Sequence, residues 1–282
     1  MTIKTIAVLG AGQMGSGIAQ VAAKAGYRVI IRDIKEEFCQ KGVSAISKGL
    51  SKQVEKGKIT QEEADAAIGN ISTTVNLEDV AEAELVIEAA PEILELKHDT
   101  FVELGKICKP EAILATNTSS MSITAITKDT HNPERCIGMH FFFPVQAMKL
   151  VEMIRSEYTN DATVEAIREV AVSLGKKPVL CQTDTPGFIV NRCLFAFMLE
   201  AIKCYEEGVA SVDDIDMAIK CGLNHPLGPF EMMDLSGLDT FPHVTETLEA
   251  LPVTTWECPE SVKKLIAEGK LGRKSGEGWH KY

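Results

Sequence analysis

The amino-terminal segment carries a glycine pattern whose chemistry is phosphate binding. Gly10, Gly12 and Gly15 form G-x-G-x-x-G in GAGQMG, after an apolar run and before a segment with helical spacing. In that context the first glycine permits a tight turn, the second lets the backbone approach a pyrophosphate, and the third allows close helix packing. Although glycines can also serve a turn alone, we predict dinucleotide contacts from the whole loop: Gly10, Ala11, Gly12, Gln13, Met14 and Gly15.

An acidic residue at the end of the next apolar run indicates the cofactor. Asp33 follows YRVIIR, where a carboxylate would accept hydrogen bonds from the adenosine ribose hydroxyls. The same carboxylate would repel the 2′-phosphate of NADP, so the sequence predicts NAD. Arg32 keeps NADP open as an alternative, because an arginine beside the carboxylate could turn to meet a phosphate.

A histidine and a glutamate flank the apolar segment FFFPV, and their chemistry would be proton transfer. Oxidation of a secondary alcohol by hydride transfer needs a base, and imidazole, with an ordinary pKa of about 6.5, can accept the proton or return it. His140 ends one predicted strand and Glu152 lies in the next, KLVEMI, so the carboxylate could hold the second ring nitrogen. The alternative is a core histidine whose hydrogen bonds are satisfied.

Eight short apolar runs are the strands predicted to position these residues. They cover residues 3–9, 27–32, 71–75, 85–89, 112–116, 135–140, 149–154 and 178–182. Helices are predicted over 14–25, 35–57, 93–107 and 162–174, and Thr60-Gln61-Glu62-Glu63 matches a capping box before another helix. This alternation indicates βαβ units, and therefore an α/β fold with a mostly parallel sheet and helices on both faces.

The pattern changes after Gln182. Asp184-Thr185-Pro186-Gly187 predicts a helix start, with a cap residue before a proline at the first helical position. Residues 188–205 are apolar on nearly all sides, which is typical of a helix buried inside a domain or against a second subunit. A further helix is predicted from Ser211, and no later segment looks like a strand. We therefore predict a sheet domain over residues 1–183 and an all-helical domain over 184–282.

The composition limits the partners and the compartment. The 282 residues carry a formal net charge of −11, which disfavours nucleic acid and anionic membranes as partners. No secretion signal is visible, and no apolar run approaches the roughly 20 residues that span a bilayer. The eight cysteines are dispersed without a C-x-x-C pair, so we expect no zinc or other metal site and a cytoplasmic protein with reduced thiols.

Seven segments together resemble one enzyme family. They are GAGQMGSGIAQ, VIEAAPE, ATNTSS, IGMHFFFPVQAMKLVE, DTPGFIVNR, NHPLGP and GRKSGEGWHKY, in the family's order over essentially the whole chain. By these segments the sequence resembles the short-chain L-3-hydroxyacyl-CoA dehydrogenases, and most of all the bacterial 3-hydroxybutyryl-CoA dehydrogenases. The resemblance implies a Rossmann-type domain followed by a helical domain that supplies a dimer interface and part of the substrate cleft.

The resemblance also implies roles for individual side chains. His140 and Glu152 match the family's catalytic pair, an acid/base and the residue that orients it. Ser119 and Asn191 match residues that contact the substrate near its reacting carbon, although the residues alone would equally suit a helix cap and a domain-interface hydrogen bond. The positions that match cofactor contacts are Glu92, Lys97, Ser119 and Lys274. For Glu92 and Lys97 the alternative is an ordinary helix start.

Three lysines recur every four residues before GKI. Lys48, Lys52 and Lys56 would lie on one face of the predicted helix. Such a stripe could receive the phosphates of coenzyme A, or it could be an ordinary solvated helix face. Lys56 matches a CoA contact of the family, and it is the lysine that we assign to the substrate.

One position departs from the family pattern, which usually reads His-Phe-Phe-Asn-Pro. Phe143 stands where the family's asparagine contacts the cofactor near the nicotinamide. A phenyl ring cannot make that polar contact, although it could stack. Phe141 and Phe142 are predicted to pack, and Gln146 replaces a common proline. The departure concerns cofactor affinity and substrate range, and it leaves the histidine and glutamate unaffected.

These features predict an NAD-dependent dehydrogenase that interconverts 3-hydroxybutyryl-CoA and acetoacetyl-CoA. A dehydrogenase of a free hydroxy acid or sugar acid on the same scaffold is the first alternative, and CoA dependence separates the two. A nucleotide-binding regulatory protein without turnover is the second alternative. The presence of His140, Glu152, Ser119 and Asn191 together favours an enzyme.

Overall fold

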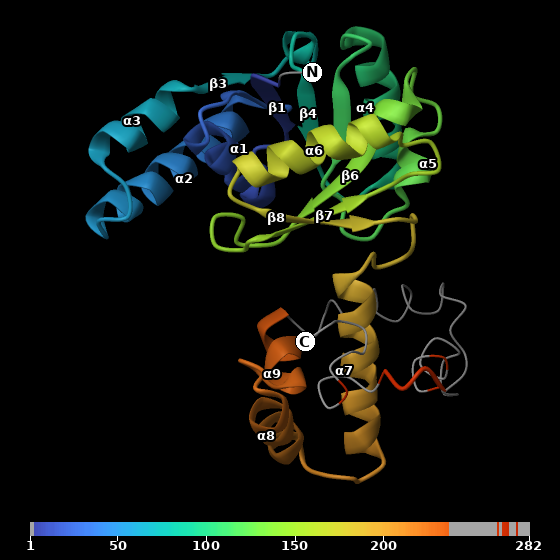
Figure 1. Cartoon of the computed structure of the whole chain (residues 1–282). Helices are drawn as coiled ribbons and strands as arrows, with labels where there is room; N and C mark the ends of the chain where they lie inside the picture. The colour runs from blue at the N-terminus through green and yellow to red at the C-terminus, as the bar shows by residue number, and fades with distance from the viewer. Residues whose placement is uncertain (1–2, 237–263, 265–266, 271–274, 276–282) are drawn as a thin grey trace. The chain divides into compact units, whose positions relative to one another are not determined.

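The computed structural model describes residues 3–236, 264, 267–270 and 275 (Figure 1). The chain divides into one compact unit over residues 1–248 and a second over 249–282. All helices and strands with defined bounds belong to the first unit, and they are the ones that position the candidate site.

The first unit contains an eight-stranded sheet in the order β3-β2-β1-β4-β5-β6-β7-β8. The strands are β1 Thr5–Leu9, β2 Arg28–Arg32, β3 Ile71–Thr74, β4 Leu85–Glu88, β5 Ile113–Thr116, β6 Cys136–Phe141, β7 Leu150–Ile154 and β8 Lys177–Cys181. Strands β1 to β6 are parallel, whereas β7 runs antiparallel to β6 and parallel to β8. All eight predicted strands are confirmed, with small shifts at their ends.

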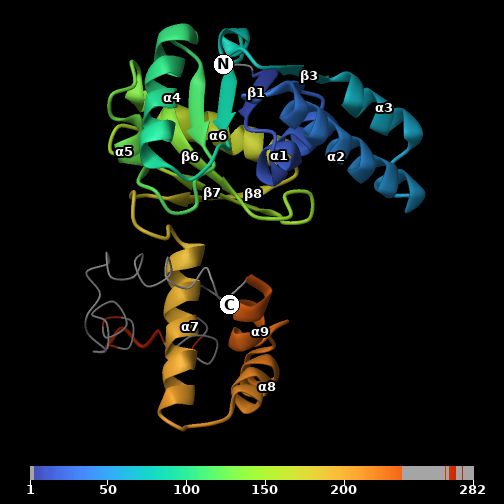
Figure 2. The ribbon, with the colours of Figure 1, turned by 180° about the vertical axis from the view of Figure 1, so that it is seen from behind.

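Helices cover both faces of the sheet. They are α1 Gln13–Lys24, α2 Glu36–Glu55, α3 Gln61–Gly69, α4 Leu94–Ile107, α5 Ile123–Thr127 and α6 Asp161–Ser173, with short 3-10 turns at Glu78–Val80 and Pro133–Arg135. Helices α1 and α6 lie on one face, and α4 and α5 lie on the other (Figures 1 and 2). Successive side chains of β1 point to opposite faces of the sheet. Ile6 and Val8 pack in the hydrophobic cluster on one face, and Ala7 and Leu9 pack in the cluster on the other.

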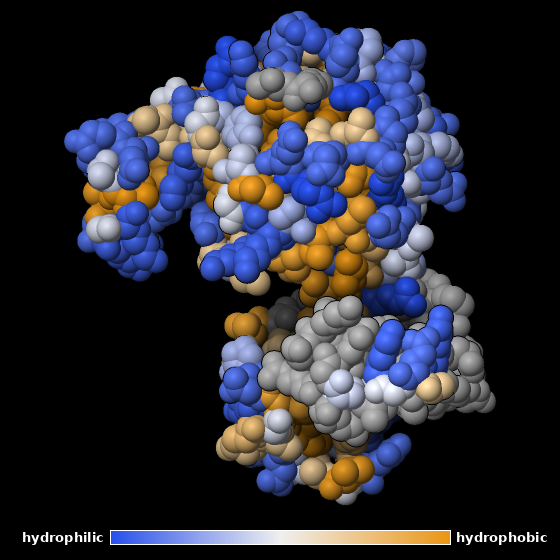
Figure 3. All heavy atoms as spheres, in the orientation of Figure 1, coloured by the Kyte–Doolittle hydropathy of each residue, from blue (hydrophilic) through white to orange (hydrophobic). Residues whose placement is uncertain are grey.

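Local signals explain where the surface helices begin and which way they face. The predicted capping box is confirmed: Thr60 Oγ1 accepts from Glu63 N at 3.2 Å, and Thr60 N donates to Glu63 Oε2 at 2.8 Å. In α6 the buried positions include Val164, Ile167 and Val170, which recur at helical spacing. Hydrophilic side chains cover much of the outer surface over α6 (Figure 3).

Three helices with defined bounds follow β8 in the described part of the chain: α7 Val190–Glu206, α8 Val212–Leu223 and α9 Pro229–Ser236. The predicted helix start at residues 184–187 is wrong. Gly187 and Phe188 have φ of 71° and 49°, so the chain makes a turn there and the helix begins at Val190. The Asp184 carboxylate instead accepts hydrogen bonds near the start of α5, from Ser122 Oγ at 2.6 Å and Thr124 N at 2.7 Å.

Helix α7 is less enclosed than its composition predicts. Met198 and Ala201 are its buried residues, and Tyr205 is exposed. The described residues do not enclose α7 on all sides, and its burial inside a domain or against a second subunit stays a prediction. The domain boundary near residue 183 also stays a prediction. Among the described residues, β8 ends at Cys181 and the later elements with defined bounds are helices.

Candidate active site

The predicted site residues of the sheet gather at one edge because the strands that carry them are parallel. The glycine loop follows β1, Glu92 follows β4, Ser119 follows β5, and His140 lies near the end of β6. These are the carboxyl ends of neighbouring strands, the edge at which open α/β sheets bind ligands. Three of the strands (β1, β4 and β5) are consecutive in the sheet, and β6 adjoins them.

Two glycines of the loop are required by close backbone contacts. Gly10 has φ of +101°, and a Cβ there would lie 2.6 Å from Ala89 O. A Cβ on Gly15 would lie 1.8 Å from Gly10 O, so this position holds α1 against the loop. Gly12 is different, because no atom lies within 4 Å of where its Cβ would stand. The space beside Gly12 is therefore open to a ligand.

The start of α1 is suited to an anion. Its N-cap is Gly12, which provides no side-chain acceptor, and the first turn contains no acidic residue. The first helical hydrogen bond runs from Ser16 N to Gly12 O at 2.9 Å, so the N–H groups of Gln13, Met14 and Gly15 have no acceptor within the helix. Unpaired N–H groups at a helix start bind phosphate, and a pyrophosphate fits this loop.

Asp33 is held against the glycine loop. Its Oδ2 accepts a hydrogen bond from Ala11 N at 2.7 Å, and its Oδ1 accepts from Ile34 N at 2.7 Å. These contacts fix a carboxylate at the end of β2, where it is suited to a ribose diol. Arg32 Nε donates to Val75 O at 3.3 Å, so in this structure the guanidinium is engaged with the chain beyond β3.

His140 and Glu152 are brought together by the single antiparallel pairing of the described sheet. The two residues lie directly opposite each other on β6 and β7, which puts their side chains on one face. His140 Nδ1 lies 2.8 Å from Glu152 Oε2, and both side chains are buried. A carboxylate is an acceptor, so Nδ1 carries the hydrogen and Nε2 of the neutral ring becomes an acceptor. No partner for Nε2 occurs among the described residues.

The second oxygen of Glu152 fixes the start of α7. Glu152 Oε1 accepts hydrogen bonds from Ile189 N at 3.0 Å and Val190 N at 2.9 Å. Two unpaired N–H groups of a helix start thereby stabilise the negative charge of a fully buried carboxylate. The arrangement ties the glutamate in place, so that it can orient the imidazole without turning away.

Aromatic rings enclose the imidazole. The ring centroid of Phe142 lies 4.5 Å from that of His140, and the centroid of Phe188 lies 5.7 Å away. Phe141 is buried in the core, as predicted, whereas Phe143 is 62% exposed. The apolar segment therefore has two roles: part of it packs, and Phe142 forms one wall beside the histidine. Phe188 was not singled out from the sequence, because its approach depends on the turn before α7.

Ser119 is held by Glu92. Ser119 N donates to Glu92 Oε1 at 3.0 Å, and Thr118 Oγ1 donates to Glu92 Oε2 at 2.7 Å. Asn191 Nδ2 donates to Ser119 O at 3.4 Å, so these two predicted substrate residues lie together. Asn191 lies in the first turn of α7 and not in the second, because the helix begins later than predicted.

Lys97 forms a buried ion pair that sequence reasoning missed. Its Nζ donates to Glu88 Oε1 at 2.7 Å and to Ala90 O at 3.1 Å, and lies 3.7 Å from Glu92 Oε2. Glu88 Oε2 accepts from Thr116 Oγ1 at 2.7 Å. In the sequence, Glu88 directly ends the apolar run LVIE. A buried carboxylate without a partner would cost free energy, so this residue was the signal that a buried cation lies nearby.

Two of the three lysines of the predicted stripe line one cavity. Lys52 and Lys56 line a cavity of about 290 Å³ together with Lys24 and Lys58, and no carboxylate lines it. Lys48 is not part of this lining. The other residues that line it are Val21, Gln53, Gln146 and Ala147. Lys274 lies outside the described residues.

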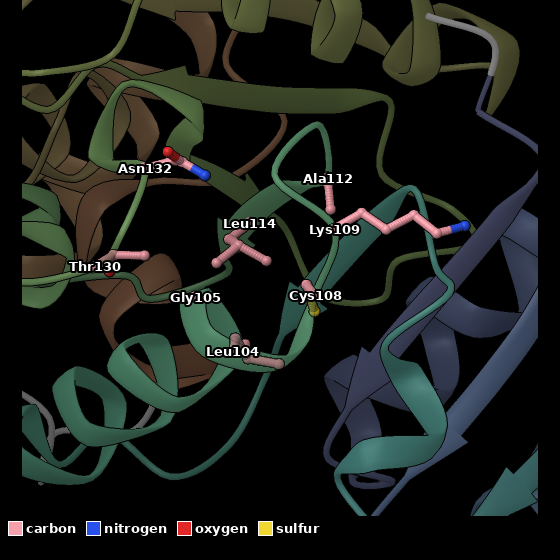
Figure 4. Close-up of a pocket in the computed structure, with 8 residues that line it drawn as sticks. All are labelled: Leu104, Gly105, Cys108, Lys109, Ala112, Leu114, Thr130 and Asn132. Carbon is pink, nitrogen blue, oxygen red and sulfur yellow. The ribbon is translucent and has the colours of Figure 1, made fainter.

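A second cavity lies at the other end of the sheet and does not belong to the site (Figure 4). Its volume of about 10 Å³ has room for at most about one water molecule. It is lined by the end of α4 and the start of β5, and burial raises the pKa of its Cys108 thiol to about 11. The thiol is therefore unreactive at neutral pH.

The unpaired Nε2 of His140 indicates the class of protein to which this site belongs. A dinucleotide loop and a proton acceptor are needed together when an alcohol is oxidised or a ketone is reduced by hydride transfer. The fold and site are accordingly those of a dinucleotide-dependent dehydrogenase.

Two family models match consecutive parts of the chain. Residues 5–185 match the model described as 3-hydroxyacyl-CoA dehydrogenase, NAD binding domain, and residues 187–282 match 3-hydroxyacyl-CoA dehydrogenase, C-terminal domain. The chain therefore belongs to the 3-hydroxyacyl-CoA dehydrogenase family, and it is an NAD-dependent enzyme. The predicted family, fold class and cofactor are confirmed.

Individual relatives agree over nearly their full length. The chain is 46% identical over 276 residues to a probable 3-hydroxybutyryl-CoA dehydrogenase of Deinococcus radiodurans, covering 98% of this chain and 99% of the relative. It is 45% identical over 282 residues to the 3-hydroxybutyryl-CoA dehydrogenase of Bradyrhizobium diazoefficiens, covering 99% and 96%. Against the crystal structure of (S)-3-hydroxybutyryl-CoA dehydrogenase from Ralstonia eutropha, the TM-score is 0.87 at 38% identity, covering 100% of this chain and 99% of that chain.

Proposed function

We propose that the protein catalyses the reversible, NAD-dependent oxidation of 3-hydroxybutyryl-CoA to acetoacetyl-CoA, with His140 as the acid/base and Glu152 as its orienting residue. The observation that carries the proposal is the 2.8 Å contact between His140 Nδ1 and Glu152 Oε2, which leaves Nε2 open at the sheet edge. The substrate is inferred from the names of the bacterial relatives.

The proton moves between the substrate oxygen and His140. During alcohol oxidation, Nε2 of the neutral imidazole accepts the hydroxyl proton as the hydride leaves C3. NAD, when bound, supplies the hydride acceptor. Glu152 stabilises the imidazolium that forms, and the N–H groups of Ile189 and Val190 keep its carboxylate in place. In ketone reduction, Nε2 returns the proton to the 3-oxygen.

Ser119 and Asn191 are the residues that we assign to substrate positioning. The 3.4 Å hydrogen bond from Asn191 Nδ2 to Ser119 O supports this assignment, because it brings α7 and the loop after β5 together. Both side chains would orient the 3-oxygen and the thioester for hydride transfer. Ser119 is also assigned to the cofactor, since it lies on the loop next to Glu92.

The remaining cofactor assignments follow from the glycine loop and the family resemblance. The loop from Gly10 to Gly15 would hold the pyrophosphate, and Asp33 would hold the adenosine ribose. Glu92, Lys97 and Lys274 are further residues that we assign to the cofactor. For Lys97, a side-chain exposure of 1% and its contacts with Glu88 and Glu92 favour a supporting role behind Glu92.

The CoA part of the substrate is assigned to Lys56 and the lysine cavity. Lys24, Lys52, Lys56 and Lys58 would concentrate positive charge in one hollow of a chain whose net charge is −11. Phosphate groups are the ligands that such a cluster favours. Free acetoacetate has no phosphate, so the cluster also separates a CoA ester from a free acid.

Assembly, domain division and location are further parts of the proposal. We assign residues 1–183 to cofactor binding and 184–282 to the substrate cleft and a homodimer interface. The half-exposed apolar helix α7 supports the dimer. We assign the enzyme to the cytoplasm on the basis of its free cysteines and bacterial relatives. Among the described residues, no helix has the length and apolarity needed to cross a membrane.

The first test is the rate of NADH oxidation with acetoacetyl-CoA. Free acetoacetate and NADPH serve as comparison substrates, and His140→Ala removes the acid. We expect fast turnover only with the CoA ester and NADH, and a loss of about 10²–10⁴-fold in His140→Ala. Unchanged circular dichroism and NADH affinity in the variant would assign the loss to chemistry.

Two results would contradict the proposal. Equal turnover of free acetoacetate would remove the CoA assignment and return the lysines to a solvated surface. A His140→Ala variant with wild-type kcat would remove the acid/base assignment.

The lysine cavity can be tested separately. Lys56→Gln should raise the KM for acetoacetyl-CoA and weaken the salt dependence of that KM. The matched Lys48→Gln, outside the cavity, should leave the KM and its salt dependence unchanged.

A further inference from the structure

Asn117 occupies a place in the sheet that the proposed mechanism has not used. The parallel pairing of β5 and β6 ends with Thr116 opposite Gly138. The last residues of β6, including His140 and Phe141, therefore extend beyond β5 and have no strand partner on that side. Asn117 is the residue that directly follows β5, and it is 9% exposed.

The side chain of Asn117 takes the place of the missing strand. Its Oδ1 accepts a hydrogen bond from Phe141 N at 2.9 Å, and its own backbone N donates to Glu88 O at 2.8 Å. One residue thus links the ends of β4 and β6. Since Phe141 is covalently joined to His140, the amide fixes the backbone that carries the imidazole on the side opposite Glu152.

The same hydrogen bond fixes which way the amide points. A backbone N–H can only donate, so the atom facing Phe141 is the Asn117 oxygen, and the Nδ2 group points elsewhere. Within the described part of the chain, Nδ2 has no hydrogen-bond partner. It is also absent from the fully buried unpaired polar atoms there, which are Gln20 Nε2, Thr127 Oγ1, Thr130 Oγ1 and Arg155 Nε. Nδ2 is therefore a donor that reaches the surface from a largely buried residue.

We propose that Asn117 is a positioning residue for His140, and that its Nδ2 donates a hydrogen bond to a carbonyl oxygen of a bound ligand. The inference rests on the proposed function, in which His140 is the acid/base. The carbonyl belongs either to the carboxamide of the nicotinamide or to the acyl part of the substrate. Both would bind at the carboxyl edge, where Asn117 lies between the loops after β4 and β6.

Two substitutions separate the acceptor from the donor. Asn117→Asp keeps an oxygen for Phe141 N but removes the Nδ2 donor, whereas Asn117→Ala removes both. We expect about a tenfold rise in one KM for Asn117→Asp, the loss that one hydrogen bond of this kind predicts. A rise in the KM for NADH identifies the nicotinamide, and a rise in the KM for acetoacetyl-CoA identifies the substrate. In Asn117→Ala, kcat should fall as well.

The pH profile gives a readout that a purely structural role would not change. The carboxylate in Asn117→Asp adds negative charge near the imidazole and favours its protonated form. Because ketone reduction needs protonated His140, the fall in kcat at high pH should move to higher pH in Asn117→Asp. Asn117→Ala should show no such upward movement.

Specific outcomes would overturn the inference. Wild-type kinetics in Asn117→Ala would remove the positioning role, and wild-type KM values in Asn117→Asp would remove the donor role. If Asn117→Ala did not fold, Asn117→Asp with wild-type KM values and an unmoved pH profile would overturn both parts. If the wild-type protein did not reduce acetoacetyl-CoA, the proposed function would fail by itself. NADH affinity would then decide the nicotinamide contact, and equal dissociation constants in wild type and Asn117→Asp would exclude it.

Discussion

Two buried side-chain pairs, each containing a glutamate, lie at the same edge of the sheet and differ in what the partner of the glutamate has free. Lys97 Nζ lies 2.7 Å from Glu88 Oε1, and His140 Nδ1 lies 2.8 Å from Glu152 Oε2. The contact distances and the degrees of burial are similar. The pairs differ in the remaining contacts of the glutamate's partner: the Lys97 ammonium contacts three oxygens, whereas Nε2 of His140 has no partner among the described residues.

The comparison shows that burial and a charged partner do not by themselves identify a reacting group. A lysine with its contacts filled within the protein stabilises the loops around it. A histidine with one nitrogen held and the other open can exchange a proton with a ligand. Both glutamates also hold backbone N–H groups, Glu88 that of Ala90 and Glu152 those of the α7 start. The open nitrogen is therefore the feature on which the proposed acid/base role of His140 rests.

The largest expected effect comes from disturbing the histidine pair. Glu152→Gln should lower kcat by about 10²–10⁴-fold, because the amide nitrogen can donate to Nδ1 and so favour the tautomer with a hydrogen on Nε2. The measurement is kcat for acetoacetyl-CoA reduction and for the reverse oxidation. Glu157→Gln, at an exposed position after β7, is the matched control. Near-wild-type oxidation by Glu152→Gln would contradict the orienting role.

Disturbing the lysine pair should change stability more than rate. Lys97→Met leaves Glu88 buried without its cation, and removal of one partner of such a pair costs about 3–5 kcal/mol. We expect a large loss in the free energy of unfolding, measured with urea, and partial recovery in the double variant Lys97→Met/Glu88→Leu. If Lys97→Met kept its stability but lost NADH affinity, Lys97 would be a cofactor contact and the comparison would fail.

A smaller effect is expected at the exposed Phe143. This side chain has no polar function at the position where the family usually has asparagine. Phe143→Asn would add one hydrogen-bonding group, so we expect the KM for NADH to fall by up to about tenfold with kcat nearly unchanged. Phe143→Ala controls for loss of the ring. An unchanged KM in Phe143→Asn would show that the position does not influence cofactor binding.

The smallest effect is a pH dependence at His98, the neighbour of Lys97. Hydrogen bonds to Asp129 and Asp99 raise the pKa of His98 above its ordinary value. A raised folded-state pKa means that this stabilisation is fully present below the unfolded pKa of about 6.5 and is lost as pH rises through the folded pKa. The Tm difference between wild type and His98→Gln should therefore be larger at about pH 6 than at about pH 9. Equal differences at both pH values would show that the contact does not depend on protonation.

Much of the fold was predictable because its signals are local. The strand runs, the Thr60–Glu63 capping box and the glycine loop each depend on a few consecutive residues and their spacing. The failure at residues 184–187 has a physical reason. A cap residue followed by proline suits a helix start, but positive φ at Gly187 and Phe188 and the use of Asp184 near α5 place the helix start later. The contact of Asp184 joins residues that are distant in the sequence, so no local sequence pattern predicts it.

The sequence alone supplied the residue types that could carry chemistry: a glycine loop, a carboxylate after the second strand, an imidazole and a second carboxylate. The tertiary structure decided which of them meet. Antiparallel pairing of β6 with β7 puts Glu152 opposite His140, and the turn before α7 brings two N–H groups and Phe188 to the pair. The contacts of Lys97 are filled within the protein, whereas His140 keeps one ring nitrogen without a partner among the described residues. The sequence could not show this difference, because only three-dimensional packing decides which polar atoms remain without a protein partner.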